Sequence, residues 1–293
     1  MLIRQKAILA LLSRAKRPLS PTVFVKLVFL LRQETVLKDE STFYDFIPYK
    51  YGPFSFTLYR ELANLRQDGY VIPDEEHIAL CERTVGLAKE KIDELSTVFL
   101  EAVDKIARQY CGKSQTNLVE DVYTRYPWYA TKSELTDLRP KSTEHTKKTC
   151  PAVYTVGYEG KSVDAFFNLL LKNRIRMLID VRANPISRRY GFSKKQLSEI
   201  AMRLDFDYCH MPKLGIPRKY RVNLSNFDSY QRLMKKYEQE MIPNLGNIID
   251  KVAMLMKETP AVLVCVEKDV RCCHRSRLAE AIAQETGLEV NHI

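Results

Sequence analysis

The residues best suited to chemistry lie in the last thirty positions of the chain. An apolar stretch from Ala261 to Val266 contains Cys265 and is followed by Glu267, and Cys273-His274-Arg275 then opens a helical pattern. A helix N-terminus attracts anions, and neighbouring positive charge lowers the pKa of a thiol. This segment therefore indicates a site that handles an anion beside a nucleophilic or metal-binding group.

Three further groups of polar residues follow apolar stretches that read as strands. These are Gly157-Tyr158-Glu159, Asp180 with Arg182, and the segment from His210 to Gly215. Helical patterns follow them, as at Ser162 to Asn173 and at Ser193 to Leu204, where Ser193 is a suitable N-cap. Strands that alternate with helices predict a mostly parallel sheet with helices on both faces. Ligands bind at the carboxyl ends of such strands, so all four groups should meet at one edge.

The elements divide the chain into two expected domains. Residues 152–293 form the α/β domain, with a strand at 206–211, a helix at 237–258, a strand at 261–266 and a last helix that ends at Gly287. Residues 1–137 form a mainly helical domain with helices at 3–15, 23–34 and 57–68, and with helical patterns again at 89–110 and 117–126. Short strands at 70–72 and 78–80 then resemble a wing, which together predict a winged helix-turn-helix. Residues 138–151, rich in Lys, Thr and Ser, are the expected linker.

Composition narrows the class of protein. The 293 residues are 45% hydrophobic and 28% charged and include seven cysteines, which fits a globular protein in a reducing compartment. No apolar run is long enough to cross a bilayer, and the start of the chain lacks a cleavage-like site, so we expect a cytoplasmic protein without a membrane partner. The net charge is +10, and residues 151–293 contribute +7 of it. This surplus predicts a polyanionic partner, whereas its alternative is a solvated basic face.

Residues 153–293 closely resemble the family catalogued as domain of unknown function 488. The resemblance rests on the segment from Val156 to Ser162, on Asp180-Val-Arg182 with Asn184-Pro185, on Lys213-Leu214-Gly215, on Cys265 to Asp269, and on Cys273 to Ser276. The first 135 residues resemble the winged-helix Panacea domain of some antitoxins, through Lys26 to Leu31, Tyr51 to Ser55, Leu65 to Gly69 and Tyr126 to Trp128. The first resemblance implies an α/β domain of unestablished chemistry, so it names no reaction.

Three carboxylates at the expected edge are candidates for acid/base work. Asp180 ends an apolar strand beside Arg182, which would keep it ionised, and its alternative role is to cap the loop that follows. Glu159 and Glu267 complete the set. A pair of carboxylates can cleave a glycosidic bond.

The sequence also offers candidate binding residues. For substrate or phosphate we expect Tyr158, Arg182, Arg188, Arg189, Lys213 and Arg275, and for a nucleic-acid rim Lys194, Lys195, Arg218, Lys219 and Arg221. Tyrosines between the basic loops, namely Tyr158, Tyr190 and Tyr220, could stack on an exposed base, although packing at a loop is their commoner role.

The cysteines admit two further hypotheses. Cys273, with His274, could be a nucleophile, or it could be an inert buried thiol. A metal could be held by a set drawn from Cys265, Cys272, Cys273, His274 and Cys209-His210. Since this spacing is unlike a compact zinc motif, the sequence prediction assigns no metal and no cofactor.

These observations favour an enzyme directed to nucleic acid, with DNA preferred over RNA, and a glycosylase-like hydrolase that processes a base as the leading activity. The winged-helix domain would bind DNA, a protein partner or a second copy of the chain. One alternative is a non-enzymatic DNA-binding regulator or antitoxin-like protein whose α/β domain senses a nucleotide. The other alternative is a cysteine-dependent enzyme.

Overall fold

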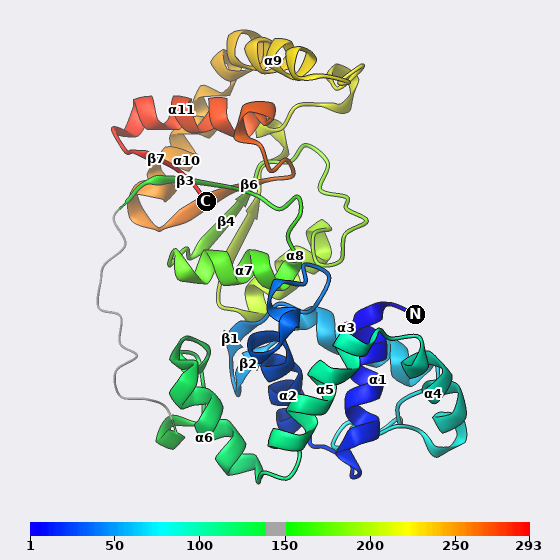
Figure 1. Ribbon diagram of the computed structural model, residues 1–293. Coiled ribbons are helices and arrows are strands. Elements are labelled where there is room, and N and C mark those ends of the chain that lie inside the picture. Colours follow the sequence, from blue (N-terminus) through cyan, green and yellow to red (C-terminus); the bar gives the residue numbers. More distant parts are fainter. Residues whose placement is uncertain (139–150) are drawn as a thin grey trace. The chain divides into compact units, whose positions relative to one another are not determined.

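The computed structural model describes residues 1–138 and 151–293, which fold as two compact units, one on each side of the segment between them (Figure 1). The expected linker, residues 138–151, lies almost wholly outside the described residues. Among the residues that are described, no helix has the length and apolar character needed to span a membrane.

The N-terminal unit is mainly helical and carries a small antiparallel hairpin. Its elements are α1 (Ile3–Ala15), α2 (Pro21–Glu34), β1 (Ile47–Tyr49), β2 (Gly52–Phe54), α3 (Phe56–Gln67), α4 (Val85–Asp93), α5 (Thr97–Tyr110) and α6 (Gln115–Arg125). Local signals set several boundaries, since Ser20 caps α2 with Pro21 in its first turn, and Ser55 caps α3. One apolar core joins the buried faces of α1, α2, α5 and α6.

Three details of this unit differ from the sequence prediction. The two expected wing strands are reduced to isolated bridges, Leu19 with Ile78 and Val71 with Leu80. The β1–β2 hairpin was not expected, because Pro48 and Pro53 remove backbone donors from it and prolines usually argue against a strand. The helical pattern from Lys89 to Tyr110 is broken between α4 and α5, where Ser96 begins a new helix.

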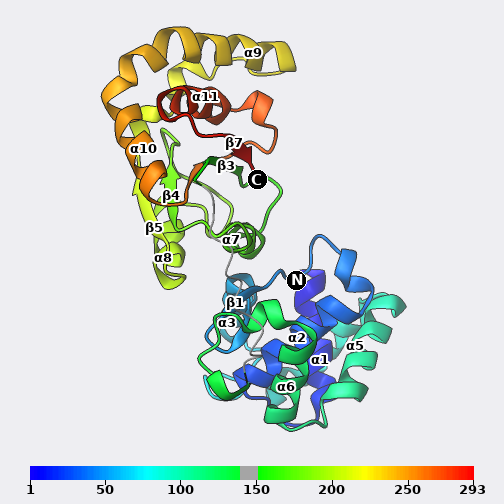
Figure 2. The same cartoon turned by 90° about the vertical axis from the view of Figure 1, so that its left-hand side faces the viewer.

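The C-terminal unit is the expected α/β domain. Its elements are β3 (Val153–Gly157), α7 (Val163–Lys172), β4 (Met177–Asp180), α8 (Lys194–Arg203), β5 (Asp207–His210), α9 (Phe227–Lys236), α10 (Gly246–Glu258), β6 (Ala261–Cys265), α11 (His274–Thr286) and β7 (Val290–His292). The five strands are parallel in the order β5-β4-β6-β3-β7. Helices α7 and α8 lie on one face, and α10 and α11 lie on the other (Figures 1 and 2).

Burial explains why this sheet forms. Every residue of β3 and of β6 is buried, as expected for inner strands covered by helices on both sides. On the α10–α11 face, residues of β3, β4 and β6 pack with Val252, Leu278 and Ile282 in one apolar cluster. Such packing holds the strand ends, and therefore the loops that follow them, in fixed positions.

The structure corrects one predicted element of this unit and adds two that were not predicted. The helix expected at 237–258 is interrupted: a π-helical turn spans Tyr237–Met241, a 3-10 turn containing Pro243 follows, and only α10 is regular. Proline lacks the amide donor that a continuous helix needs there. Helix α9 and strand β7 were not predicted, and β7 is short and mostly exposed, so it carries little of the apolar pattern by which a strand is recognised.

Candidate functional site at the carboxyl edge of the sheet

The strand register brings the expected polar groups to one edge. Gly157 of β3 is opposite Cys265 of β6, while Asp180 of β4 is opposite Val264 of β6 and His210 of β5. The four loops that begin after these strands therefore leave the sheet together. This edge is where an open parallel sheet binds its ligands.

Asp180 lies at the bottom of this edge and is fully buried. Its carboxylate accepts from the backbone N–H of Arg182 at 3.2 Å, from Arg182 Nε at 2.8 Å and Nη2 at 2.6 Å, and from the hydroxyl of Tyr208 at 2.7 Å. Burial by itself would lower the pKa of Arg182, but the hydrogen bonds and charge of Asp180 raise it above its usual value. Asp180 and Arg182 thus form a buried ion pair in which both carboxylate oxygens accept hydrogen bonds.

Arg182 also connects Asp180 to two neighbouring loops through hydrogen bonds. It is 3% exposed, and its Nη1 donates to the Tyr158 hydroxyl at 3.1 Å and to the carbonyl of Phe192 at 2.8 Å. The ring of Tyr158 is stacked on Phe192 with 4.2 Å between centroids and 10° between planes. The Tyr158 ring and the Arg182 guanidinium are thus used inside the protein, which differs from the expected contacts with a base or a phosphate.

A second buried cluster lies at the end of β6. The sulfurs of Cys265 and Cys273 and a ring nitrogen of His274 lie within 4.8 Å of one another, and all three residues are buried. Cys265 Sγ is 3.1 Å from Glu267 Oε2 and 3.7 Å from His274 Nδ1. The cluster joins the end of a strand to the start of α11, and it includes three of the five residues expected to act in chemistry.

Glu267 is the carboxylate of this cluster, and it pairs with Arg221. Its Oε1 accepts from Arg221 Nη1 at 3.0 Å, and its side chain is 16% exposed. Burial would raise the pKa of Glu267, but hydrogen bonding from Cys273, the charge of Arg221 and hydrogen bonding from Cys265 lower that pKa to about 2. Glu267 is therefore ionised at neutral pH, and it cannot serve there as a proton donor.

Cys273 has the opposite electrostatics. Burial, followed by its neighbour Cys265, raises the pKa of the Cys273 thiol well above its ordinary value, although His274 acts in the other direction. A reactive cysteine needs a lowered pKa and access to solvent, and Cys273 is 0% exposed. The structure therefore does not give Cys273 the exposed environment with a lowered pKa that the sequence suggested for a thiolate nucleophile.

Arg275 and Gly157 hold the two central loops together. The guanidinium of Arg275 is buried and donates to the carbonyl of Glu267 and, at 3.2 Å, to that of Lys268. A Cβ on Gly157 would lie 1.9 Å from the Glu267 carbonyl oxygen, so only glycine allows this approach. Arg275 therefore braces a loop, whereas the sequence prediction gave it a phosphate.

The remaining predicted residues lie in the segments that follow β3, β4 and β5 at the same edge. Glu159 is exposed and accepts from the backbone N–H of Lys268 at 2.8 Å. Arg189 donates from Nη1 to the carbonyls of Tyr158 and Lys161, both at 3.2 Å. Seven basic side chains of this region are exposed, namely Arg188, Arg189, Lys194, Lys195, Lys213, Arg218 and Lys219. We call these seven the basic rim.

Several contacts at this edge were missed by sequence reasoning. Tyr208 and Phe192 complete the Asp180–Arg182 network, and Arg221, expected on the nucleic-acid rim, instead pairs with Glu267. Nothing in the sequence ties Tyr208 to Asp180, because they lie on neighbouring strands. The rest of the proposed metal set separates: Cys209, His210 and Cys272 do not join the Cys265 cluster, and His210 Nε2 contacts the Arg182 carbonyl at 2.9 Å.

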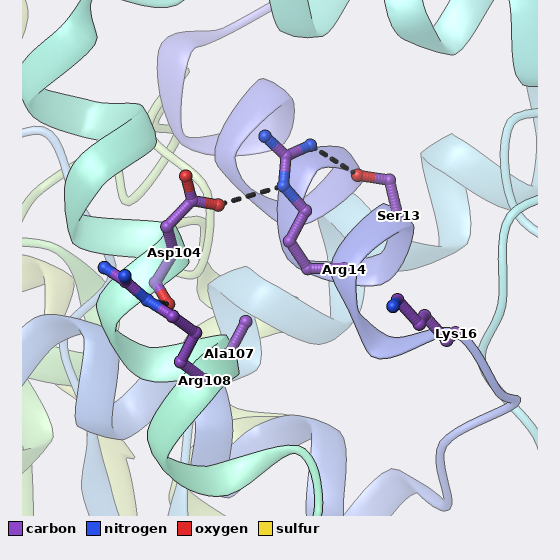
Figure 3. Close-up of a pocket in the computed structure, with 6 residues that line it drawn as sticks. All are labelled: Ser13, Arg14, Lys16, Asp104, Ala107 and Arg108. Carbon is purple, nitrogen blue, oxygen red and sulfur yellow. Dashed lines mark hydrogen bonds and ion pairs between the residues drawn. The ribbon is translucent and has the colours of Figure 1, made fainter.

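A surface groove of about 460 Å³ lies in the N-terminal unit between α1 and α5, and Figure 3 shows its lining. Arg14 Nε donates to Asp104 Oδ1 at 2.9 Å and Arg14 Nη1 donates to Ser13 Oγ at 3.0 Å, with Lys16 and Arg108 alongside. The groove thus holds one partly exposed ion pair, Arg14–Asp104, and its described residues form no cluster of metal ligands. The groove therefore offers less chemistry than the sheet edge.

The C-terminal unit is therefore an α/β domain whose carboxyl edge holds two buried cysteines, a buried histidine and the ionised Glu267, together with the exposed basic rim. Residues 162–282 match the model of a family described as Domain of unknown function DUF488, so the C-terminal unit contains a DUF488 domain. The match begins at Ser162, so the turn at Gly157, which the expected resemblance included, lies just before it. No curated protein matches the chain. No solved structure matches it either.

Proposed function

We propose that this protein is an enzyme directed to nucleic acid, and that it hydrolyses a bond to a base at the carboxyl edge of the sheet. The observation that carries the proposal is that the basic rim belongs to the segments that follow β4 and β5, at the same edge of the sheet as the loop that holds an ionised Glu267. Clustered Lys and Arg side chains attract a phosphate backbone of any sequence. The reacting bond would then lie near a fixed negative charge.

Glu267 is the carboxylate best placed to act on such a bond. An ionised carboxylate stabilises the positive charge that develops on a sugar as its glycosidic bond breaks. Glu159 comes from the adjacent loop, which a hydrogen bond joins to the loop of Glu267. Asp180 is a positioning residue in this scheme, because its oxygens are occupied by Arg182 and Tyr208 and it holds the loop of Tyr158 through Arg182.

The proposal gives the N-terminal unit the task of gripping duplex DNA or a partner, as the resemblance to winged-helix Panacea domains implies. The bridges between Leu19 and Ile78 and between Val71 and Leu80 support it, since they set short extended segments before α2 and after α3. A wing in a winged helix-turn-helix takes the second of these places.

The test is incubation of the full chain with duplex and single-stranded DNA and RNA, unmodified and base-modified. Released base and alkali-labile sites are scored for the wild type, for Glu267→Gln and for the control Glu285→Gln, an exposed residue near the end of α11. We expect product from the wild type and the control and none from Glu267→Gln. Equal product from Glu267→Gln and the wild type would refute the role of Glu267.

A non-enzymatic regulator is the second candidate. The Asp180–Arg182–Tyr158 network favours it, because its buried polar groups already have hydrogen-bond partners inside the protein and so form a rigid centre of the kind a sensor needs. Binding of DNA by the wild type without any product on these substrates would support this candidate.

The cysteine-dependent enzyme predicts loss of function on alkylation of the native protein, whereas a buried Cys273 predicts resistance to alkylation.

A further inference from the structure

The cluster at the start of α11 has the geometry of a metal site. In a tetrahedral zinc site, bond lengths of about 2.3 Å to sulfur and about 2.05 Å to nitrogen place two such ligand atoms about 3.6 Å apart. Cys265 Sγ and His274 Nδ1 are 3.7 Å apart, and Cys273 Sγ completes a group within 4.8 Å. Glu267 Oε2 lies 3.1 Å from Cys265 Sγ, although it is not one of the three ligand atoms that lie within 4.8 Å of one another. An ion between the two sulfurs and the imidazole would therefore contact three residues directly, and Glu267 would reach it by a movement of its side chain.

The imidazole of His274 is held in the orientation that a metal requires. Its Nε2 is 3.1 Å from the carbonyl oxygen of Val181, which can only accept, so Nε2 carries the proton. In the neutral ring Nδ1 then has a free lone pair, and this atom faces Cys265. A hydrogen bond from the second ring nitrogen to a carbonyl is the usual support of a metal-binding histidine.

Charge balance also favours a divalent ion. Two thiolates and the Glu267 carboxylate carry three negative charges, a divalent cation leaves one, and Arg221, which pairs with Glu267, offsets that one. The combination of sulfur, imidazole and carboxylate ligands suits zinc better than the hard cations calcium and magnesium.

We propose that Cys265, Cys273, His274 and Glu267 bind one zinc ion at the carboxyl end of β6. The three buried side chains hold the ion, and Glu267, which pairs with Arg221, takes the fourth position. The site rests on side-chain geometry and not on the reaction proposed above. It can therefore be tested by metal content alone.

The experiment uses the reduced full-length chain, purified after expression with added zinc, and measures zinc by mass spectrometry. We expect about one zinc per chain, and less than ~0.1 per chain in Cys265→Ser and in Cys273→Ser. Cys272→Ser and Cys209→Ser are the matched controls, because both are partly exposed cysteines outside the cluster, and both should keep the wild-type content.

A second measurement does not depend on the folding of a variant. Cobalt is added to the metal-free wild-type chain, and thiolate coordination should give a charge-transfer band together with the visible bands of a tetrahedral ion. A mercurial that caps thiols should then release the metal. The inference is overturned by a wild-type chain that binds neither zinc nor cobalt, by zinc retained in Cys273→Ser, or by a disulfide between Cys265 and Cys273 in the native protein.

The two proposals fail in different ways. Zinc at one per chain without any nucleic-acid product would leave the metal site standing and refute the hydrolase. Product from a chain that binds no metal would do the reverse.

Discussion

Burial of Lys26 makes the stability of the N-terminal unit depend on pH in an unusual direction. The side chain is 1% exposed, its ammonium donates to the carbonyl of Tyr51, and it lies 5.6 Å from the centroid of the Tyr123 ring. Burial lowers the pKa of Lys26 from 10.5 to about 7. The folded chain therefore releases this proton several pH units before the unfolded chain does.

The sign and size follow from proton linkage. Below pH 7 Lys26 is charged in both the folded and the unfolded state, and the full cost of burying its charge applies. Between about pH 7 and 10.5 the unfolded state binds more protons than the folded state, so the free energy of unfolding rises with pH. At about 1.4 kcal/mol per pH unit, the largest contribution over this window is about 5 kcal/mol. Lys26→Met should remove the rise and stabilise the unit at pH 6 by about 2 to 4 kcal/mol, after the loss of about 1 kcal/mol for the hydrogen bond to Tyr51.

The assay is urea denaturation between pH 6 and pH 10, followed by the fluorescence of Trp128. The chain has a single tryptophan and it belongs to the N-terminal unit, so the signal reports on that unit. Lys38→Met, which changes an exposed lysine, is the control and should keep the wild-type pH dependence. The reasoning is refuted if Lys26→Met and the wild type show the same slope of stability against pH.

Three further predictions concern the C-terminal unit. Asp180→Asn leaves the buried charge of Arg182 without its partner and should destabilise the unit by about 3 to 5 kcal/mol. The loss is measured as faster hydrogen exchange in β4 and β5, and unchanged exchange would contradict the prediction. Gly157→Ala sets a Cβ 1.9 Å from a carbonyl oxygen and should cost about 3 kcal/mol or more in thermal unfolding, whereas an unchanged melting temperature would show that the loop can yield. Replacing Lys194 and Lys195 by Glu should weaken DNA binding and lower by about 2 the slope of the logarithm of the binding constant against the logarithm of the salt concentration. The same change at Lys172 and Arg176, at the opposite edge of the sheet, should have neither effect. Equal effects of the two pairs would disprove a localised basic rim.

Much of the C-terminal fold could be predicted because its signals are local. Ser162 accepts from the backbone N–H of Ala165 and so marks the start of α7 with residues three positions apart. The apolar runs of β3, β4 and β6 need burial on both faces, which only helices around a parallel sheet provide. A parallel sheet in turn brings every strand's carboxyl end to one edge. The meeting of the four loops there was therefore predictable without coordinates.

The roles of side chains at that edge were less predictable. Arg182 and Arg275 look like phosphate ligands in the sequence, yet both are buried and donate to the protein itself. Whether a guanidinium faces solvent or a carbonyl depends on how neighbouring loops cover it. That covering is a tertiary property with no local signature.

Residues a few positions apart, together with composition, are enough to predict the starts of α1, α7 and α8, the parallel sheet, the edge at which the polar loops meet and the surplus of basic residues there. The grouping of Cys265 with Cys273 and His274, the pairing of Arg221 with Glu267 and the burial of Asp180 depend instead on tertiary structure. Those contacts join residues of different strands, loops and helices. They exist because packing against the core fixes where each strand ends, and the sequence does not record such distances.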